Sequence, residues 1–264
     1  FFWWICSSIQ TVRAVRRLKP DLIHIHGKFS IPAGVIAGRL FGVKTAYTAR
    51  DYRTLCNYGI CISEHEESHR CSFSEYWTWE FPAYMRLYTS GGAWDWIKNS
   101  VFAVRGRVWS RILYWFTRRV DTVVCVSKAV ARIYRTNGIT QTQVIYNIQP
   151  SITTTPQHHN TTTQKKEVVF VGKLSPGKGG GLLGPVIKYT HNFDSTIRWS
   201  IFTNGGLLYD QFISEIQPLI ESGIVKINGY VPNAELLARM RGASAVFVPS
   251  VWHEPLTRLG LESL

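Results

Sequence analysis

The feature that most limits the fold of this chain is a repeated order of apolar run, turn and helix-like segment. Residues 21–27 read as a strand that runs into a glycine turn, and residues 43–48 read as a second strand after a helix-like stretch. Strand, helix and strand in this order predict a parallel sheet with right-handed crossovers. Ligands of such sheets collect at the carboxyl ends of the strands. The chain is therefore expected to be an α/β protein with its sites at those ends.

Polar and small residues follow both of these predicted strands. His24, His26 and Gly27 stand at the end of the first strand, and Arg50 and Asp51 follow the second. Their position predicts that they face a ligand on this side of the sheet. Histidines at a strand end also occur as ordinary packing residues, so the sequence leaves both interpretations open for His24 and His26.

A second strand-to-helix turn begins near residue 167. The apolar run ends at Gly172 and is followed by Lys173, Lys178 and three consecutive glycines. A strand, a glycine turn, two lysines and a helix are the parts from which a backbone cradle for phosphate is built. The spacing is not that of a Walker loop. The alternative is a glycine-rich turn with solvated lysines.

The last seventeen residues contain a third turn of this kind. Residues 245–248 read as a buried strand, and Pro255 suits the first turn of a following helix. Glu254 precedes that expected helix and Glu262 lies about two turns inside it. Free N–H groups at the helix start predict an anion site. The N–H groups expected to form it are those of Leu256 to Leu259, and Leu256, Thr257 and Arg258 are counted among the donor-binding residues.

These turns resemble the motifs of the retaining, nucleotide-sugar-dependent family 4 glycosyltransferases, above all their E-x7-E signature. The resemblance implies the GT-B fold, in which two Rossmann-like domains with parallel sheets face a cleft. It predicts an acceptor-binding domain at 1–147, a linker or exposed insertion at 148–166 and a nucleotide-sugar-binding domain at 167–264. Both domains are expected to be incomplete, because the chain lacks an initiator Met and stops within a predicted helix.

The resemblance also implies roles for single residues. Glu254 corresponds to the glutamate that contacts the transferred sugar, and Glu262 to the one that holds the ribose. The residues implied at the remainder of the donor site are Gly172, Lys173, Lys178, Gly205, Tyr230 and Val231. Such enzymes need no metal and no cofactor other than the nucleotide-diphosphate sugar, which is a co-substrate. The implied acceptor is a glycan, a lipid-linked precursor or another cell-envelope precursor.

One position departs from the family pattern. Residues 48–56 look like the family segment written H-D-Y-W…L-C, but Arg50 replaces its histidine. Arginine donates hydrogen bonds and does not act as a base near neutral pH. With Glu254 and Asp51, Arg50 is still placed among the candidate catalytic residues. The departure keeps a second interpretation open, in which the chain is an inactive or epimerase-type nucleotide-sugar-binding protein.

The charge is concentrated in one half. Residues 1–150 hold 20 Lys and Arg against 9 Asp and Glu, whereas the remainder holds 10 against 8. A basic half points to an anionic lipid surface or to nucleic acid, and no recognisable nucleic-acid module supports the latter. The segment from Lys98 to Arg119 has helical spacing, interleaved aromatics and no acidic residue. It is either an interfacial helix or an ordinary surface helix with a solvated basic face.

Compartment and metal chemistry are constrained by the cysteines and by hydropathy. The five cysteines are odd in number and irregularly spaced, which favours a reducing compartment and matches no common zinc pattern. No run of eighteen apolar residues appears. The expected location is the cytoplasm, with peripheral attachment to the inner face of the membrane as an option.

Overall fold

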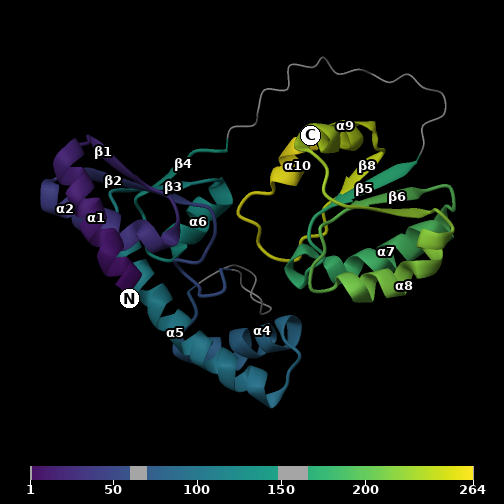
Figure 1. Ribbon diagram of the computed structural model, residues 1–264, viewed down its shortest axis with the longest axis horizontal. Coiled ribbons are helices and arrows are strands. Elements are labelled where there is room, and N and C mark those ends of the chain that lie inside the picture. The colour runs from purple at the N-terminus through teal and green to yellow at the C-terminus, as the bar shows by residue number, and fades with distance from the viewer. Residues whose placement is uncertain (1, 60–69, 148–165, 264) are drawn as a thin grey trace. The chain divides into compact units, whose positions relative to one another are not determined.

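The computed structural model describes residues 2–59, 70–147 and 166–263, and the chain divides into two compact units (Figure 1). The first unit comprises Phe1–Asn147 with His253–Leu256, and the second comprises Ile148–Trp252 with Thr257–Leu264. The expected domain ranges differ from this division at His253–Leu256, which group with the first unit. The expected linker at 148–166 lies outside the described residues except for its last position.

The first unit is built on a four-stranded parallel sheet in the order β1-β2-β3-β4. Its strands are β1 (Leu22–Ile25), β2 (Lys44–Ala49), β3 (Thr122–Cys125) and β4 (Thr142–Val144). Its longer helices are α1 (Phe2–Leu18), α2 (Ile31–Phe41), α5 (Ala93–Thr117) and α6 (Lys128–Thr136), and the short η1 (Lys28–Ser30) leads into α2. Apolar side chains of β1, β2, β3, α2 and α6 form its core. The parallel sheet predicted from the sequence is confirmed.

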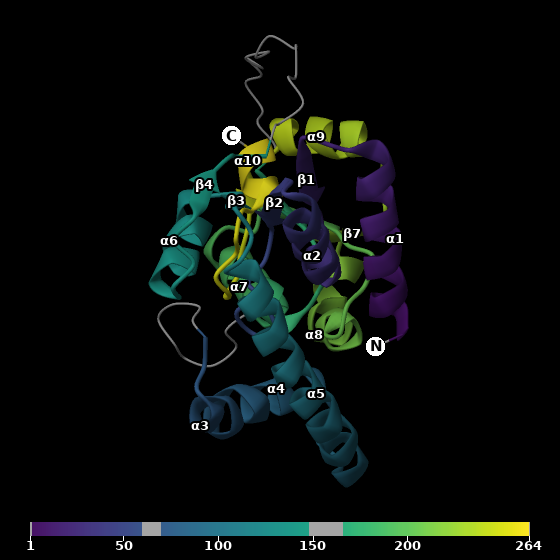
Figure 2. The same ribbon diagram turned by 90° about the vertical axis from the view of Figure 1, so that its left-hand side faces the viewer.

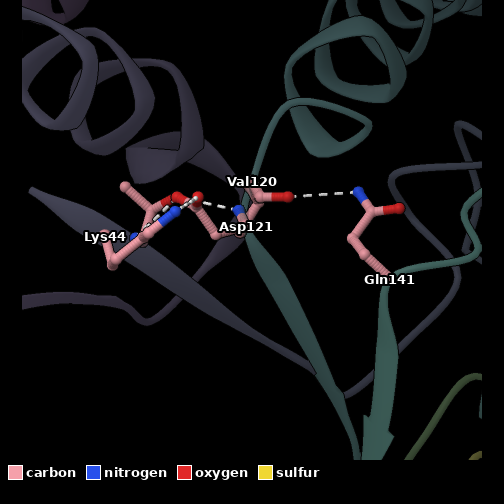
Figure 3. Close-up of polar contacts among 5 residues, drawn as sticks. Lys44, Val120, Asp121 and Gln141 are labelled. Carbon is pink, nitrogen blue, oxygen red and sulfur yellow. Dashed lines mark hydrogen bonds and ion pairs between the residues drawn. The ribbon is translucent and has the colours of Figure 1, made fainter. Parts of the chain in front are cut away.

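The starts of β2 and β3 are tied together by a polar cluster (Figure 3). Asp121 accepts hydrogen bonds from the Thr45 backbone N–H at 2.9 Å and its hydroxyl at 2.8 Å, and it pairs with Lys44 at 3.1 Å. Desolvation opposes ionisation, but these donors outweigh it and lower the pKa of Asp121. Gln141, just before β4, donates to the Val120 carbonyl at 3.2 Å. The strand register, and with it the position of the strand ends, is fixed from this edge.

A helical subdomain interrupts the first unit between β2 and β3. It contains α3 (Phe73–Glu75), the π-helical η2 (Tyr76–Glu80) and α4 (Phe81–Tyr88), and α4 packs beside the first half of α5 (Figure 2). An aromatic-rich cluster holds these segments together. Helix α5 begins at Ala93, before the segment of helical spacing that the sequence indicates from Lys98 to Arg119. Among the described helices, none is both long and apolar enough to cross a bilayer.

The second unit contains another parallel sheet, in the order β7-β6-β5-β8. Its strands are β5 (Glu167–Val171), β6 (Arg198–Phe202), β7 (Val225–Asn228) and β8 (Ala245–Phe247). Its helical segments are η3 (Pro176–Lys178), α7 (Gly180–Phe193), α8 (Tyr209–Glu221), α9 (Asn233–Gly242) and α10 (Arg258–Glu262). Helices α7 and α8 cover one face of the sheet and α9 the other (Figure 1). The second parallel sheet is thus also as expected.

Candidate functional site

The strand order of the second unit creates a switch point between β5 and β8. From β5 the chain adds β6 and β7 on one side and then returns to place β8 on the other. The loops that leave two such neighbouring strands diverge to opposite sides, and open α/β sheets bind ligands in the crevice they leave. The predicted phosphate turn follows β5, and the predicted terminal motif follows β8. Two motifs read separately in the sequence therefore meet at one edge of the sheet.

Contacts between these loops are close and depend on glycine. Gly179 has a left-handed φ of 70°, and a Cβ there would lie 2.0 Å from the Pro249 carbonyl oxygen. The Val251 N–H donates to the Gly177 carbonyl at 3.2 Å. On the other side, a Cβ at Gly206 would lie 2.3 Å from a backbone oxygen of the β5 turn. Side chains larger than hydrogen are excluded at these positions, so the backbone of the turn stays close to its neighbours.

Lys178 and Lys173 occupy different environments in this turn. Lys178 is partly buried immediately before α7, and its Nζ lies 5.6 Å from the centroid of the Trp252 ring. Burial lowers the pKa of the Lys178 ammonium group. Lys173 is exposed. The fourteen-residue α7 directs its first N–H groups toward the same edge. A cation and a helix start that converge there are suited to bind a phosphate group.

The terminal motif differs from the expected helix. The helix begins at Arg258 and not at Pro255, because the Thr257 hydroxyl accepts the Gly260 N–H at 3.3 Å and thereby caps it. The N–H groups of Leu256 and Thr257 therefore precede the helix, and the anion site expected there stays a prediction. With only five residues, α10 offers little helix dipole. Leu256 belongs to the first unit, where it packs against the core.

The two glutamates of the E-x7-E motif lie in different units. Glu254 belongs to the first unit and Glu262 ends α10 in the second. Glu262 pairs with Arg258 one turn earlier at 3.0 Å, and its side chain is only 9% exposed. A ribose hydroxyl that bound Glu262 would have to share this carboxylate with Arg258. The assigned roles of both glutamates remain predictions.

The other implied donor residues flank the carboxyl ends of β6 and β7. Gly205 follows β6, and its carbonyl accepts hydrogen bonds from the Leu174 N–H at 3.0 Å and the Thr203 hydroxyl at 3.1 Å. Tyr230 and Val231 follow β7. The Tyr230 side chain is 87% exposed, whereas Val231 packs against the cluster beneath α9. All of these positions therefore border the same edge of the second sheet.

In the first unit, the ends of β1 and β2 bring three basic side chains together. His24 bonds to the Thr48 hydroxyl at 2.8 Å, and its ring lies 4.2 Å from that of His26. Desolvation, followed by the charges of His26 and Arg50, lowers the pKa of His24. All three side chains are exposed to solvent, and the Arg50 guanidinium supplies a positive charge that suits an anionic ligand. Gly27 follows with a left-handed φ of 83°.

The contacts of Asp51 are with Arg53 and Tyr134. Its carboxylate accepts the Arg53 N–H at 2.9 Å and lies 3.8 Å from the Arg53 guanidinium. Its backbone carbonyl accepts the hydroxyl of the fully buried Tyr134 at 3.0 Å. These contacts assign Asp51 a part in holding the loop after β2, which orients Arg50. The structure does not place the Asp51 carboxylate beside the histidines.

Several contact residues of these sites were missed in the sequence. Trp252 beside Lys178 and Pro249 beside Gly179 both stand in the terminal motif, but their partners become apparent only once β8 pairs with β5. The Ser127 hydroxyl caps α6 by accepting the Val130 N–H at 3.2 Å. It also donates to the Pro255 carbonyl at 2.6 Å, within the first unit. Among the described residues, no three His, Cys, Asp or Glu side chains are grouped to hold a metal ion.

A family profile supports the resemblance inferred from the motifs. The profile of a glycosyl transferase 4-like domain matches residues 3–147. That range spans α1 through the end of β4 and so covers the first unit almost completely. No curated protein sequence matches the chain.

Three solved structures with a similar fold are distant from this chain in sequence. HepE from Anabaena, in a complex with UDP and glucose, is 17% identical with a TM-score of 0.57, and the match covers 97% of this chain and 59% of HepE. The lipopolysaccharide outer core galactosyltransferase WaaB is 10% identical with a TM-score of 0.61, and the match covers 100% of this chain and 59% of WaaB. Sucrose-phosphate synthase from Thermosynechococcus elongatus is 13% identical with a TM-score of 0.59, and the match covers 96% of this chain and 56% of the synthase.

The chain thus spans less than two thirds of the length of each of these proteins. Their similarity to both units identifies the fold class, since each match extends over nearly the whole chain. The profile match covers more than half of the 264 residues. The protein belongs to the glycosyl transferase 4-like family, and its two parallel-sheet units have the GT-B fold.

Proposed function

We propose that the protein is a glycosyltransferase that moves a sugar from a nucleotide-diphosphate sugar to a hydroxyl acceptor with retention of anomeric configuration. The observation that carries the proposal is the glycine-rich turn at the switch point between β5 and β8. There Gly179, the partly buried Lys178 and the start of α7 converge, in a chain of this family. A site that holds a diphosphate is what such a donor requires.

The reaction assigned to this site breaks the bond between the anomeric carbon of the sugar and the diphosphate oxygen. Negative charge develops on that oxygen, and Lys178 with the N–H groups of α7 stabilises it. A bond then forms between the same carbon and the acceptor oxygen. The departing phosphate oxygen takes the acceptor proton on the same face of the sugar, which preserves the configuration. Glu254 is assigned to the sugar hydroxyls and Glu262 to the ribose.

The donor and acceptor classes follow from the comparisons only as proposals. HepE was solved with UDP and glucose, which favours a uridine diphosphate sugar as the first donor to test. WaaB acts on a lipopolysaccharide core, which favours a glycan or a lipid-linked precursor as the acceptor. In this proposal neither a metal nor a cofactor takes part. The basic group of His24, His26 and Arg50 is assigned to the acceptor side.

A second candidate is a nucleotide-sugar-binding protein that does not transfer, or one that epimerises the sugar. Arg50 favours it, because this residue stands where the family motif has a histidine and cannot serve as a base near neutral pH. Both candidates require the same donor site. They differ in whether a glycosidic bond to an acceptor forms.

Binding and transfer are separated by two measurements on the same protein. A thermal-shift screen with UDP-, GDP- and ADP-sugars should identify one stabilising donor class, and a CMP-sugar serves as a matched control because it lacks the diphosphate. NMR of the product with the selected donor should then show the anomeric configuration of the donor. Stabilisation without product supports the second candidate. No shift with any diphosphate sugar would contradict both.

A further inference from the structure

Helix α5 presents a continuous apolar stripe to solvent. Its members stand at alternating steps of three and four residues, with one final step of seven, which places them on one side of a helix. They are Trp94, Ile97, Val101, Val104, Val108 and Trp115, and we call them the α5 stripe. Their exposed fractions run from 49% for Trp115 to 74% for Trp94. Contiguous exposed apolar surface of this extent marks an interaction site.

The stripe lies opposite the face by which α5 packs on its own unit. The buried residues of the helix are Ala103, Arg107, Ser110, Leu113 and Thr117. At about 100° per residue they centre roughly half a turn away from the stripe. The apolar positions face outward, and Arg107 is buried with its guanidinium donating to the Cys71 carbonyl.

Basic residues border the stripe on both sides. Lys98 and Arg105 lie along one margin and Arg111 and Arg118 along the other, by the same helical spacing. All four are exposed. No acidic residue occurs between positions 96 and 120. Lysine and arginine at such margins can extend toward phosphate groups while the apolar stripe is buried between them.

We propose that α5 docks on the surface of an anionic lipid bilayer, with the stripe in the headgroup region and the basic margins on lipid phosphates. The helix has 25 residues, carries charge along its length and does not qualify as a membrane span. Trp94 and Trp115, near its two ends, suit the water–lipid interface. A second copy of the chain is disfavoured as the occupant, since pairing two α5 stripes would oppose like-charged margins.

The first experiment measures flotation of the protein with vesicles of phosphatidylcholine alone or mixed with phosphatidylglycerol. We compare the parent with a double variant, Val101→Glu with Val108→Glu. The matched control is Tyr189→Glu with Phe193→Glu, which adds the same charge at exposed positions of α7 in the second unit. Binding to the anionic vesicles should fall about tenfold or more in the stripe variant, because binding scales with buried apolar area. In the control variant, binding to the anionic vesicles should fall only slightly, because its two added negative charges lie outside the α5 stripe. Circular dichroism verifies that the variants remain folded.

A second pair of measurements tests the basic margins and the competing occupant. Arg105→Gln with Arg111→Gln should weaken binding and flatten its dependence on salt. No binding of the parent to anionic vesicles, or equal binding of parent and stripe variant, overturns the proposal. Self-association of the parent in sedimentation velocity that the stripe variant abolishes would assign the stripe to a second copy and also overturn it. None of these readouts depends on sugar transfer.

Discussion

Replacing Lys178 with methionine tests the phosphate site most directly. Methionine keeps the length and the packing of the side chain beside Trp252 and removes its charge. The lysine charge is partly buried, and this burial lowers its pKa. An anionic ligand offsets that desolvation, so the charge contributes more to the complex than to the free protein. We therefore expect a large effect on diphosphate binding and a small one on stability.

The magnitudes follow from the contacts. A charge-assisted hydrogen bond contributes about 1.5–3 kcal/mol, which corresponds to a roughly 10- to 150-fold rise in Kd for UDP. In the free protein, relief of desolvation is opposed by the loss of the contact with the Trp252 ring, worth about 0.5–1 kcal/mol. The gain from relieved desolvation and the loss of the ring contact partly cancel, and solvent screens both because Lys178 is only partly buried. The free energy of unfolding should therefore change by less than about 1 kcal/mol.

The assay is isothermal titration of UDP into the parent and the variants. Lys188→Met is a matched control, because Lys188 is exposed on the far part of α7 and pairs with Glu215 at 3.0 Å. The affinity of the parent should also fall as the pH rises through the pKa of Lys178, which lies below its usual value of 10.5. Lys178→Met should lack this component. Equal Kd values for the parent and Lys178→Met would refute the assignment of the turn as a diphosphate site.

Three further changes test the remaining assignments. Asp121→Asn should destabilise the protein by about 1 kcal/mol at neutral pH. Because the folded pKa of Asp121 is lowered, thermal unfolding should show this difference shrinking as the pH falls below 3.8. Ser127→Ala should cost about 1–2 kcal/mol in urea unfolding, since the hydroxyl caps α6 and donates to the Pro255 carbonyl. In donor kinetics, Glu254→Gln should lower kcat at unchanged UDP affinity, whereas Glu262→Gln should weaken the binding of UDP itself.

The parallel sheets could be predicted because their signals are local. Short β-branched runs that end at glycine or serine, followed by residues with helical spacing, specify strand, turn and helix one after another. Strand pairing over longer separations has no such local signal. That β8 pairs with β5 rather than with β7 decides where the crevice lies, and this appears only in the fold. The sequence supplied the loops, and the sheet order brought them together.

Helix α5 shows a different limit. Helical spacing separates an apolar face from a basic one, but it does not say which of them faces the protein. The usual assumption buries the apolar face. Here Ala103 and Leu113 contribute apolar contacts on the other side, and Arg107 is accommodated by the Cys71 carbonyl and by the Tyr76 ring at 5.2 Å. A buried guanidinium with specific partners reverses the orientation that hydropathy alone predicts.

The terminal segment shows how two local rules compete. Pro255 is compatible with the first turn of a helix, and Thr257 is a good cap two residues later. The helix begins after Thr257, because the Thr257 hydroxyl accepts the Gly260 N–H. The Pro255 carbonyl instead accepts a hydrogen bond from the Ser127 hydroxyl in the first unit. The segment therefore leaves the second unit after Trp252 and returns at Thr257.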